Sequence, residues 1–178
     1  VEQGLDDHAK DQLIIGHNII GLDIKAIQLV YPDWKHNDVI DTLVLSRLLF
    51  PNIKDKDFVS RPEGMSTKLF GKHSLKAWGH RLGNYKDDYD GGFETYNQEM
   101  MDYMCQDVRV TVNLYEHCMA QEPAPDAVKL EHQIAQVCAD MEQTGFVFDT
   151  TGAAQLYAEL SDKRNSIRAA MEDTFEPT

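Results

Sequence analysis

The stretch LIIGHNIIGLD, from Leu13 to Asp23, carries the strongest indication of the fold. Its first five residues form a short apolar run containing a glycine, which predicts a buried β-strand over 13–17. Residues 18–21 predict a turn. Apolar residues then recur at helical spacing over 22–31, and Pro32 ends that predicted helix. A buried strand that leads directly into a helix is typical of α/β proteins.

The same order recurs further along the chain. A second short strand is predicted over 38–41, and an apolar helix over 42–50 that Pro51 ends. Residues 52–72 are charged and show no clear periodicity, so we expect a long loop there. Loops of that length inside a compact domain are usually functional or mobile.

Helix boundaries are readable in the next segment. Ser74 is expected to cap a short helix, with Gly83 just after its end. The acidic residues 84–96 contain a predicted turn at Gly91-Gly92. Asn97 is expected to cap a longer helix that runs to about Met119.

A proline-rich tripeptide, Pro123 to Pro125, predicts a domain boundary. Beyond it we expect an amphipathic helix that ends at Gly145, a short extended piece over 146–148, and another helix that starts at Asp149 or Thr150. The predicted organisation is therefore an α/β domain over 1–122 and an all-helical segment over 123–178.

Composition excludes several classes of protein. Of the 178 residues, 42% are hydrophobic and 26% charged, which predicts a folded chain, and no apolar run reaches membrane-spanning length. Three cysteines without a CxxC pair argue against a disulfide framework or a cysteine-rich zinc site and favour a reducing, cytoplasmic setting. A net charge of −13 disfavours a simple DNA-coating protein. Residues 54–81 nevertheless carry seven Lys and Arg against three acids, so this region is either a phosphate-contacting loop or an ordinary solvated one.

A few polar residues at predicted strand ends and on predicted helices are candidates for catalysis or metal binding. Tyr103 and Asp107 are four residues apart on a predicted helix, so they share a face, where a carboxylate can bind a divalent metal and a phenol can orient water. Asp23 follows the first strand, where it is either a helix cap or a member of a catalytic cluster. Asp41 closes the second strand and has the same two alternatives.

These residues resemble known motifs. The segment from His17 to Asp23 resembles the second exonuclease motif of the DEDD superfamily, in which an Asn precedes an Asp at fixed spacing. The segment from Tyr103 to Asp107 resembles the third motif, Tyr-x-x-x-Asp, of the tyrosine subclass. Residues 40–48, 70–83 and 99–103 resemble stretches of the family A DNA polymerases of short-tailed bacteriophages, and residues 130–149 resemble the segment that joins exonuclease to polymerase in that family.

The resemblance implies a ribonuclease H-like 3′–5′ exonuclease fold that proofreads DNA, followed by the first helices of a polymerase domain. It implies two divalent metals, Mg²⁺ or Mn²⁺, that clamp the scissile phosphate. Asp23 and Asp107 would bind metal and, with Tyr103, form the catalytic set. Asn18, Lys72 and His73 would contact the substrate, a single-stranded DNA 3′ end. The remainder of the polymerase and a processivity factor would be partners, in the cytoplasm of an infected bacterium and without a membrane.

The superfamily's first motif, Asp-x-Glu on a strand, has one literal match here, at Asp140 and Glu142. It falls on a predicted helix, where residues two apart face away from each other, so we interpret it as chance. Asp6-Asp7 has neither the spacing nor a strand around it. We therefore expect the first motif and the first strands of the fold to lie outside this sequence, and this chain alone to bind metal poorly and to be inactive.

Two alternatives stay open at this point. One is a standalone exoribonuclease of the same superfamily, and the other is an exonuclease fold retained only as a non-catalytic scaffold. The segment after Pro125 argues against the first, and the retention of the motif residues Asn18, Asp23, Tyr103 and Asp107 argues against the second.

Overall fold

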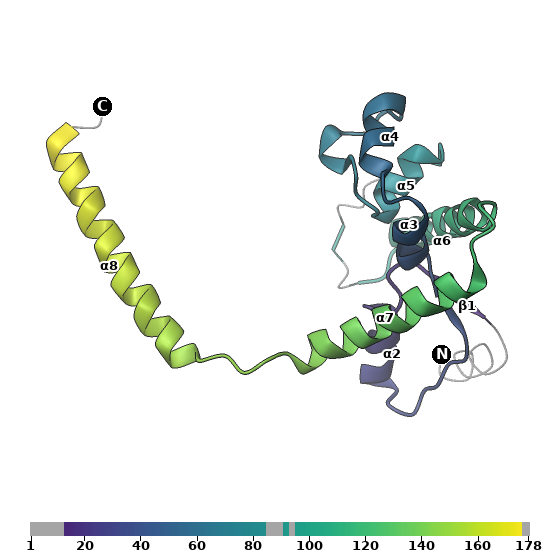
Figure 1. The fold of residues 1–178 in the computed structure, drawn as a ribbon, viewed down its shortest axis with the longest axis horizontal. Coiled ribbons are helices and arrows are strands. Elements are labelled where there is room, and N and C mark those ends of the chain that lie inside the picture. The colour runs from purple at the N-terminus through teal and green to yellow at the C-terminus, as the bar shows by residue number, and fades with distance from the viewer. Residues whose placement is uncertain (1–12, 85–90, 93–94, 176–178) are drawn as a thin grey trace. The chain divides into compact units, whose positions relative to one another are not determined.

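The computed structural model describes residues 13–84, 91–92 and 95–175 (Figure 1). The chain divides into two compact units, Val1–Glu142 and Gln143–Thr178. Each unit is described by itself below. None of the described helices is both long and apolar enough to cross a bilayer.

The first unit is built around a small parallel sheet. Strand β1 (Ile14–Gly16) pairs with β2 (Val39–Asp41), in a register that places Ile14 opposite Val39 and Gly16 opposite Asp41. Helix α2 (Asp23–Val30) connects them, as a parallel pair requires a crossover rather than a tight turn. Both predicted strands and the first helix are confirmed. The described part of the chain is mixed α/β and mostly helical, and two strands do not establish the ribonuclease H-like arrangement.

The expectation of a loop over 52–72 is wrong. After α3 (Thr42–Leu49) the chain forms α4 (Ile53–Ser60) and a single 3₁₀ turn, η1 (Thr67–Leu69). Two side chains one turn apart on α4, Ile53 and Asp57, are buried. An aspartate in a sequence is normally taken for a surface residue, so Asp57 did not count towards an apolar face. The apolar periodicity that predicts a helix was therefore absent.

The predicted helix caps are confirmed. Helix α5 (Leu75–Arg81) begins where the Ser74 hydroxyl accepts a hydrogen bond from the Ala77 N–H, and Gly83 follows it with φ +65°. Helix α6 (Gln98–Met119) begins where Asn97 Oδ1 accepts from the Met100 N–H at 2.7 Å. Most of the acidic segment between them, at 85–90 and 93–94, lies outside the described residues. So does Asp6-Asp7.

Two groups of buried apolar side chains stabilise this unit. The helical group joins α3 to α6 and comprises Leu45, Phe50, Ile53, Trp78, Leu114 and Cys118. The sheet group lies against β1 and α2 and comprises Ile19, Ile20, Ile24, Trp34 and Ala139. The last member comes from a helix more than 100 residues away in the sequence, so α7 belongs to this unit.

Helix α7 (Pro125–Thr144) is fastened to the sheet by hydrogen bonds as well. The Asp41 N–H donates to His132 Nε2 at 2.8 Å, and His132 Nδ1–H donates to the Val128 carbonyl at 2.8 Å, which fixes the neutral tautomer of the ring. The Lys25 ammonium donates to the Ala139 carbonyl.

The compact unit ends at Glu142, whereas the sequence predicts a domain boundary at Pro123–Pro125, which stays a prediction. Pro125 starts helix α7, since proline fits the first helical turn, where no intrahelical N–H bond is needed. That residues 123–178 belong to a polymerase half remains a proposal.

The second unit consists of α8 (Thr150–Phe175) and the residues before it. Asp149 caps the helix, with Oδ1 accepting from the Gly152 N–H at 2.9 Å. No residue of α8 is buried. The helix exposes five large apolar side chains, namely Leu156, Tyr157, Leu160, Ile167 and Met171.

Candidate functional site

Asp23 and Asp107 line the same cavity, of about 600 Å³, although 84 residues separate them in the sequence. Asp23 is the first residue of α2, and Asp107 lies on α6 where that helix passes β1. The structure thus brings together the two carboxylates that the sequence predicted as metal ligands. Their catalytic role stays a prediction.

One face of α6 forms a wall of this cavity. Residues 107, 108, 111, 112, 115 and 116 line it, a helical pattern of one and two turns. Thr111 donates its hydroxyl hydrogen to the Asp107 carbonyl at 2.8 Å. Glu116 adds a third acidic side chain to the lining, and no motif in the sequence identifies it. The one feature of the sequence that could have identified Glu116 is its helical spacing from Asp107, and many other residues of α6 have such a spacing.

Tyr103 is not among the residues that line this cavity. It is half-buried one turn before Asp107 on α6. Of the predicted catalytic set, the cavity lining therefore contains Asp23 and Asp107 but not Tyr103. A shared helix face places two side chains in neighbouring turns, but only the surrounding elements determine which turn faces a cavity.

Asp41 has a structural role instead of a place in the cavity. Its side chain is 1% exposed and accepts three backbone hydrogen bonds, from Asn18 N–H (2.8 Å), Ile20 N–H (3.2 Å) and Leu43 N–H (2.9 Å). Of the two alternatives, the helix cap is the one observed. Asp41 is not among the residues that line the cavity, and both of its oxygens are occupied by the loop after β1 and the start of α3.

Asp41 also shapes the turn that carries Asn18. Asn18 has a left-handed backbone, φ +61°, which asparagine tolerates better than most residues. Its Oδ1 lies 2.8 Å from where a Cβ on residue 21 would be, so Gly21 leaves room for the Asn18 side chain. The strand–turn–helix segment is consequently held by one buried carboxylate and one glycine.

The electrostatic environment of Asp23 disfavours its charge. Desolvation by neighbouring protein atoms raises the pKa of Asp23, its own backbone hydrogen bond lowers it, and the negative charge of Asp41 raises it further. The net direction is upward. A carboxylate whose charge lacks compensation is a suitable partner for a cation.

A second cavity, of about 610 Å³, adjoins the first. Its lining comprises His17, Asn18, Leu43, Arg47, Gly71, Lys72, His73, Ser74 and Leu75. His17 and Leu75 line both cavities, so the two lie next to each other. The structure therefore brings together all three predicted substrate-contacting residues, Asn18, Lys72 and His73. Arg47 also lines this cavity and was missed, because the resemblance over residues 40–48 assigns it no role and it lies in a largely apolar helix.

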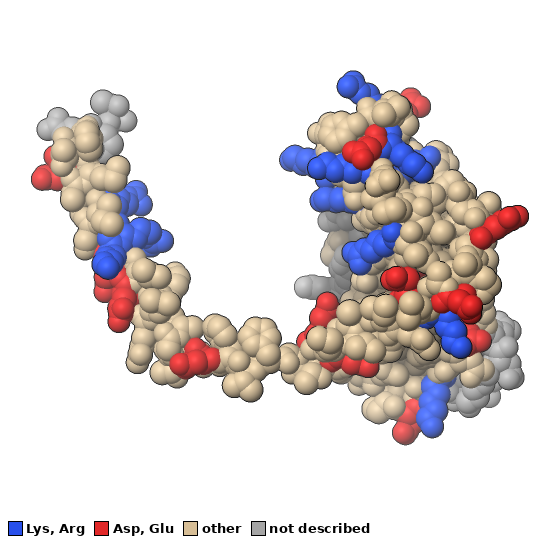
Figure 2. All heavy atoms as spheres, in the orientation of Figure 1, with Lys and Arg blue, Asp and Glu red and all other residues tan. Residues whose placement is uncertain are grey.

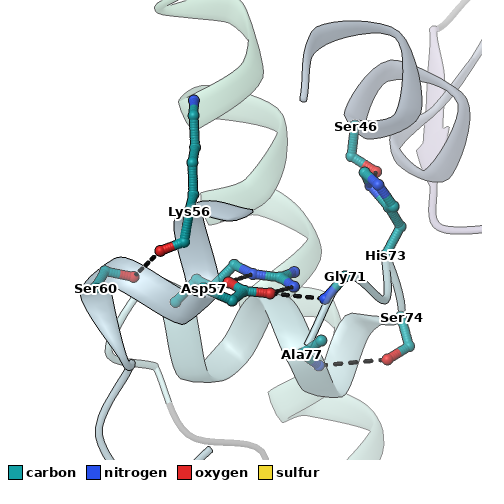
Figure 3. Close-up of polar contacts among 9 residues, drawn as sticks. Ser46, Lys56, Asp57, Ser60, Gly71, His73, Ser74 and Ala77 are labelled. Atoms are coloured by element: carbon teal, nitrogen blue, oxygen red, sulfur yellow. Dashed lines mark hydrogen bonds and ion pairs between the residues drawn. The ribbon is translucent and has the colours of Figure 1, made fainter. Parts of the chain in front are cut away.

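Hydrogen bonds fix both histidines of this second cavity. Ser46 donates its hydroxyl hydrogen to the Leu43 carbonyl (3.0 Å), so His73 Nδ1, 3.1 Å from Ser46 Oγ, carries the proton that joins them. In the same way Thr42 donates to the Gly16 carbonyl (3.1 Å) and accepts from His17 Nδ1 (2.9 Å). Both rings are thereby held by α3, and Figure 3 shows the His73 ring beside Ser46.

The loop that carries Lys72 and His73 is fixed by a hydrogen bond to Asp57, which lies beside Gly71 (Figure 3). Asp57 Oδ2 accepts from the Gly71 N–H at 2.8 Å. The same carboxylate receives Arg81 Nε at 2.9 Å and Arg81 Nη2 at 2.7 Å. Side-chain exposures of 2% and 8% make this a buried, bidentate ion pair. It connects α4, the loop and α5.

Among the described residues, no group of three or more His, Cys, Asp and Glu side chains is arranged to hold a metal ion. Mg²⁺, however, is commonly bound through one or two carboxylates, with water and substrate phosphate completing the shell. Asp23 and Asp107 in one cavity, with the pKa of Asp23 raised, fit a cation of that kind.

Comparison with known proteins gives two relatives. The chain is 34% identical to the "DNA-directed DNA polymerase" of Escherichia phage T7, over a match that covers 94% of this chain and 30% of the relative. It is 37% identical to the "DNA-directed DNA polymerase" of Enterobacteria phage T3, over 76% of this chain and 25% of the relative. The chain is homologous to part of these phage DNA polymerases.

The match to the phage T7 polymerase covers so much of the chain that it includes residues of both units. The chain spans only about a quarter to a third of the length of the relatives. No family model matches the sequence.

Proposed function

We propose that the chain forms part of the 3′–5′ proofreading exonuclease region of a phage family A DNA polymerase. The observation that carries the proposal is the shared cavity of Asp23 and Asp107, the two acids that the motif resemblance singles out. The relatives' names add support, since both are DNA-directed DNA polymerases. Residues 123–178 would then lead into the polymerase domain, and the enzyme would act in the cytoplasm of an infected bacterium.

In this proposal Asp23 and Asp107 would hold Mg²⁺ or Mn²⁺, and the substrate would be the 3′ end of a single strand of DNA. Bound metal supplies charge neutralisation and an activated water. Asn18, Lys72 and His73 hold the strand beside the carboxylates, because they line the adjoining cavity. Tyr103 is proposed to orient the water from its position one turn before Asp107. Phosphoryl transfer needs mainly such positioning and charge stabilisation.

The decisive experiment uses the full-length polymerase. Asp107→Ala should abolish release of 3′ nucleotides from a labelled single strand in Mg²⁺ while DNA synthesis continues. Asp102→Ala is the matched control, because Asp102 is an exposed acid on the same helix that lines neither cavity and accepts a hydrogen bond from Gln98. Equal exonuclease rates in the parent and in Asp107→Ala would contradict the proposal.

The 178-residue chain itself offers a second test. With two predicted ligands in the cavity, Mn²⁺ should bind weakly, and we expect slow or no hydrolysis of single-stranded DNA by the chain alone. Electron paramagnetic resonance of Mn²⁺ should show binding that Asp23→Asn and Asp107→Asn remove and Asp102→Asn leaves unchanged. Rapid hydrolysis by the chain that is lost in Asp107→Ala would show that another acid, such as Glu116, completes the site.

The non-catalytic scaffold is the second candidate. It is favoured by the position of Tyr103 outside the cavity lining and by the lack of a three-ligand group among the described residues. A full-length polymerase that synthesises DNA but releases no 3′ nucleotides from a single strand in Mg²⁺ or Mn²⁺ would favour it. An exoribonuclease would instead degrade an RNA strand faster than the DNA strand of the same sequence.

A further inference from the structure

Helix α7 packs against both groups of buried apolar side chains in the first unit. Near its start, Val128 lies against the helical group, which includes Leu114 of α6. Near its end, Ala139 belongs to the sheet group, which includes Ile24 of α2. Helices α2 and α6 are the two elements that carry the predicted metal ligands. Helix α7 is therefore placed to influence how both of these elements are held.

The inward and outward sides of α7 differ in character. Figure 2 shows acidic side chains on the surface of this part of the first unit, and Asp126, Asp140 and Glu142 of α7 are exposed. The inward side contributes the buried side chain of Ala139 and the half-buried imidazole of His132. An amphipathic helix of this kind is held mainly by the contacts of its inward side.

The imidazole of His132 joins α7 to the end of β2. His132 Nδ1 lies 2.8 Å from the Val128 carbonyl, which can only accept a hydrogen bond, so Nδ1 carries the proton. The unprotonated Nε2 therefore faces the Asp41 N–H, which donates to it at 2.8 Å. Asp41 is the last residue of β2 and is buried. A side chain without an acceptor at position 132 would leave this N–H without its partner.

Asp41 carries the connection from α7 to the turn between β1 and α2. Its buried carboxylate accepts from the Asn18 N–H at 2.8 Å and from the Ile20 N–H at 3.2 Å. Asn18 has φ +61°, a conformation that costs a non-glycine residue free energy and persists where its surroundings hold it. The turn leads directly into α2, whose first residue is Asp23. The backbone of Asp41 therefore binds α7, and its side chain holds the turn.

A second hydrogen bond ties α7 to α2 itself. The Lys25 ammonium donates to the Ala139 carbonyl. Lys25 lies in the first turn of α2, two residues after Asp23. The contacts of α7 thus reach both the start of α2 and the residue that fixes the turn before it.

We infer that α7 is a strap that holds the turn between β1 and α2, and that His132 is a positioning residue for the carboxylate cavity, acting through Asp41. His132 lines neither the cavity of Asp23 and Asp107 nor the adjoining one, so it touches no reacting atom. The link from the strap to hydrolysis rests on the proposed exonuclease function. The link from the strap to the turn does not.

The test is amide hydrogen exchange of the 178-residue chain, followed residue by residue by NMR. His132→Leu removes the acceptor at Nε2 and should speed exchange of the Asn18 and Ile20 N–H groups roughly tenfold, the effect of one lost buried hydrogen bond. Leucine has room there, because His132 lines a cavity of about 590 Å³ whose walls are largely apolar. His132→Gln supplies a carbonyl oxygen close to the position of Nε2 and should restore most of the protection.

The parent chain gives an independent spectroscopic signature. A long-range ¹H–¹⁵N spectrum should show His132 with a protonated Nδ1 and an unprotonated Nε2. The opposite tautomer would overturn the inference, because Nε2 could then not accept from the Asp41 N–H. If His132→Leu does not fold, His132→Asn takes its place beside His132→Gln, since the shorter asparagine side chain does not reach the position of Nε2.

His36→Leu is the matched control. His36 lines the same cavity, but its Nδ1 bonds the carbonyl of the next residue, so this variant should leave exchange at Asn18 and Ile20 as in the parent. Equal acceleration in the two variants would overturn the inference, as would unchanged exchange in His132→Leu. The Leu114 N–H, in the buried part of α6, reports opening of the whole unit. If His132→Leu accelerates Leu114 as much as Asn18, the histidine acts on overall stability alone and the strap falls.

Binding of Mn²⁺ separates this inference from the proposed function. In electron paramagnetic resonance, His132→Leu should weaken Mn²⁺ binding by up to about tenfold, and His132→Gln should restore it. If exchange responds to His132→Leu and Mn²⁺ binding does not, His132 is no positioning residue for the carboxylates. If the parent chain binds no Mn²⁺ but exchange at Asn18 depends on His132, the strap stands and the metal proposal falls. If Mn²⁺ binding depends on Asp23 and Asp107 while neither readout responds to His132→Leu, the strap falls alone.

Discussion

Replacing Asp57 by Ala should be among the most destabilising single changes in the first unit. Asp57 accepts two hydrogen bonds from Arg81 and one from the Gly71 N–H, and both members of the ion pair are buried. Removal of the carboxylate leaves a guanidinium buried without its counter-charge. Breaking a buried pair in this way costs about 3–5 kcal/mol. The total stability of a typical domain is only about 5–15 kcal/mol.

The fluorescence of the two tryptophans provides the assay. Trp34 and Trp78 are 7% and 2% exposed, and both belong to the first unit, so unfolding in guanidinium chloride reports that unit. The Arg81 guanidinium lies 4.9 Å from the Trp78 ring centroid, which makes the emission sensitive to the ion pair itself. In thermal unfolding the same loss corresponds to a Tm lowered by about 10 °C.

Two further variants separate charge from packing. Asp55→Ala removes an exposed acid from the same helix and should change stability by less than about 0.5 kcal/mol. The double variant Asp57→Leu with Arg81→Met removes both charges and should be more stable than Asp57→Ala alone. A loss below about 1 kcal/mol in Asp57→Ala would refute the reasoning, because it would mean that Arg81 is adequately solvated without its partner.

The pH dependence has a defined sign. Burial acts to raise the pKa of Asp57, but the hydrogen bonds from Arg81 and Gly71 and the charge of Arg81 outweigh it, so the pKa lies below its ordinary value. The pair's stabilisation is therefore complete above the unfolded pKa of about 3.9 and is lost as the pH falls through the folded pKa. The parent and Asp57→Ala should differ fully at pH 7 and converge only in strong acid.

Three other outcomes are expected. Asp23→Asn should raise the free energy of unfolding at pH 7 by less than about 0.5 kcal/mol, because the side chain is exposed. The raised pKa of Asp23 makes its charged form unfavourable in the folded state, so the gain should vanish below the unfolded pKa, where the carboxyl is protonated in both states. A loss of stability measured by urea unfolding would contradict this. Leu114→Ala should cost about 2–5 kcal/mol in the same unfolding assay because Leu114 is fully buried between helices, whereas Met104→Ala on an exposed position of α6 should be near neutral. Burial raises the pKa of Cys118 to about 11, so a thiol reagent at pH 8 should modify Cys105 and Cys138 in the native chain and Cys118 only after unfolding; three rapid modifications without denaturant would disprove it.

The sequence by itself determined the features that depend on neighbours along the chain. Ser74 and Asn97 cap helices because each side chain bonds a backbone N–H three residues on, and that geometry needs no distant partner. The strand, turn and helix over 13–30 form as predicted, because a short apolar run and a proline stop are local signals. The motifs alone single out Asp23 and Asp107, although it is the fold that places both in one cavity.

Only the tertiary structure decided which side chains of a helix are buried or line a cavity, because similar short sequences can be exposed or buried. Asp57 can be buried on α4 because Arg81, 24 residues later, forms an ion pair with it. A sequence window over α4 does not include that partner. Arg47 enters the second cavity because α3 packs beside the loop of Lys72. Helix α7 belongs to the first unit because Ala139 packs in the apolar group beside α2 and His132 accepts a hydrogen bond from the Asp41 N–H of β2. In each case the deciding free energy comes from desolvation and pairing between residues far apart in sequence, which exist only once the chain has folded.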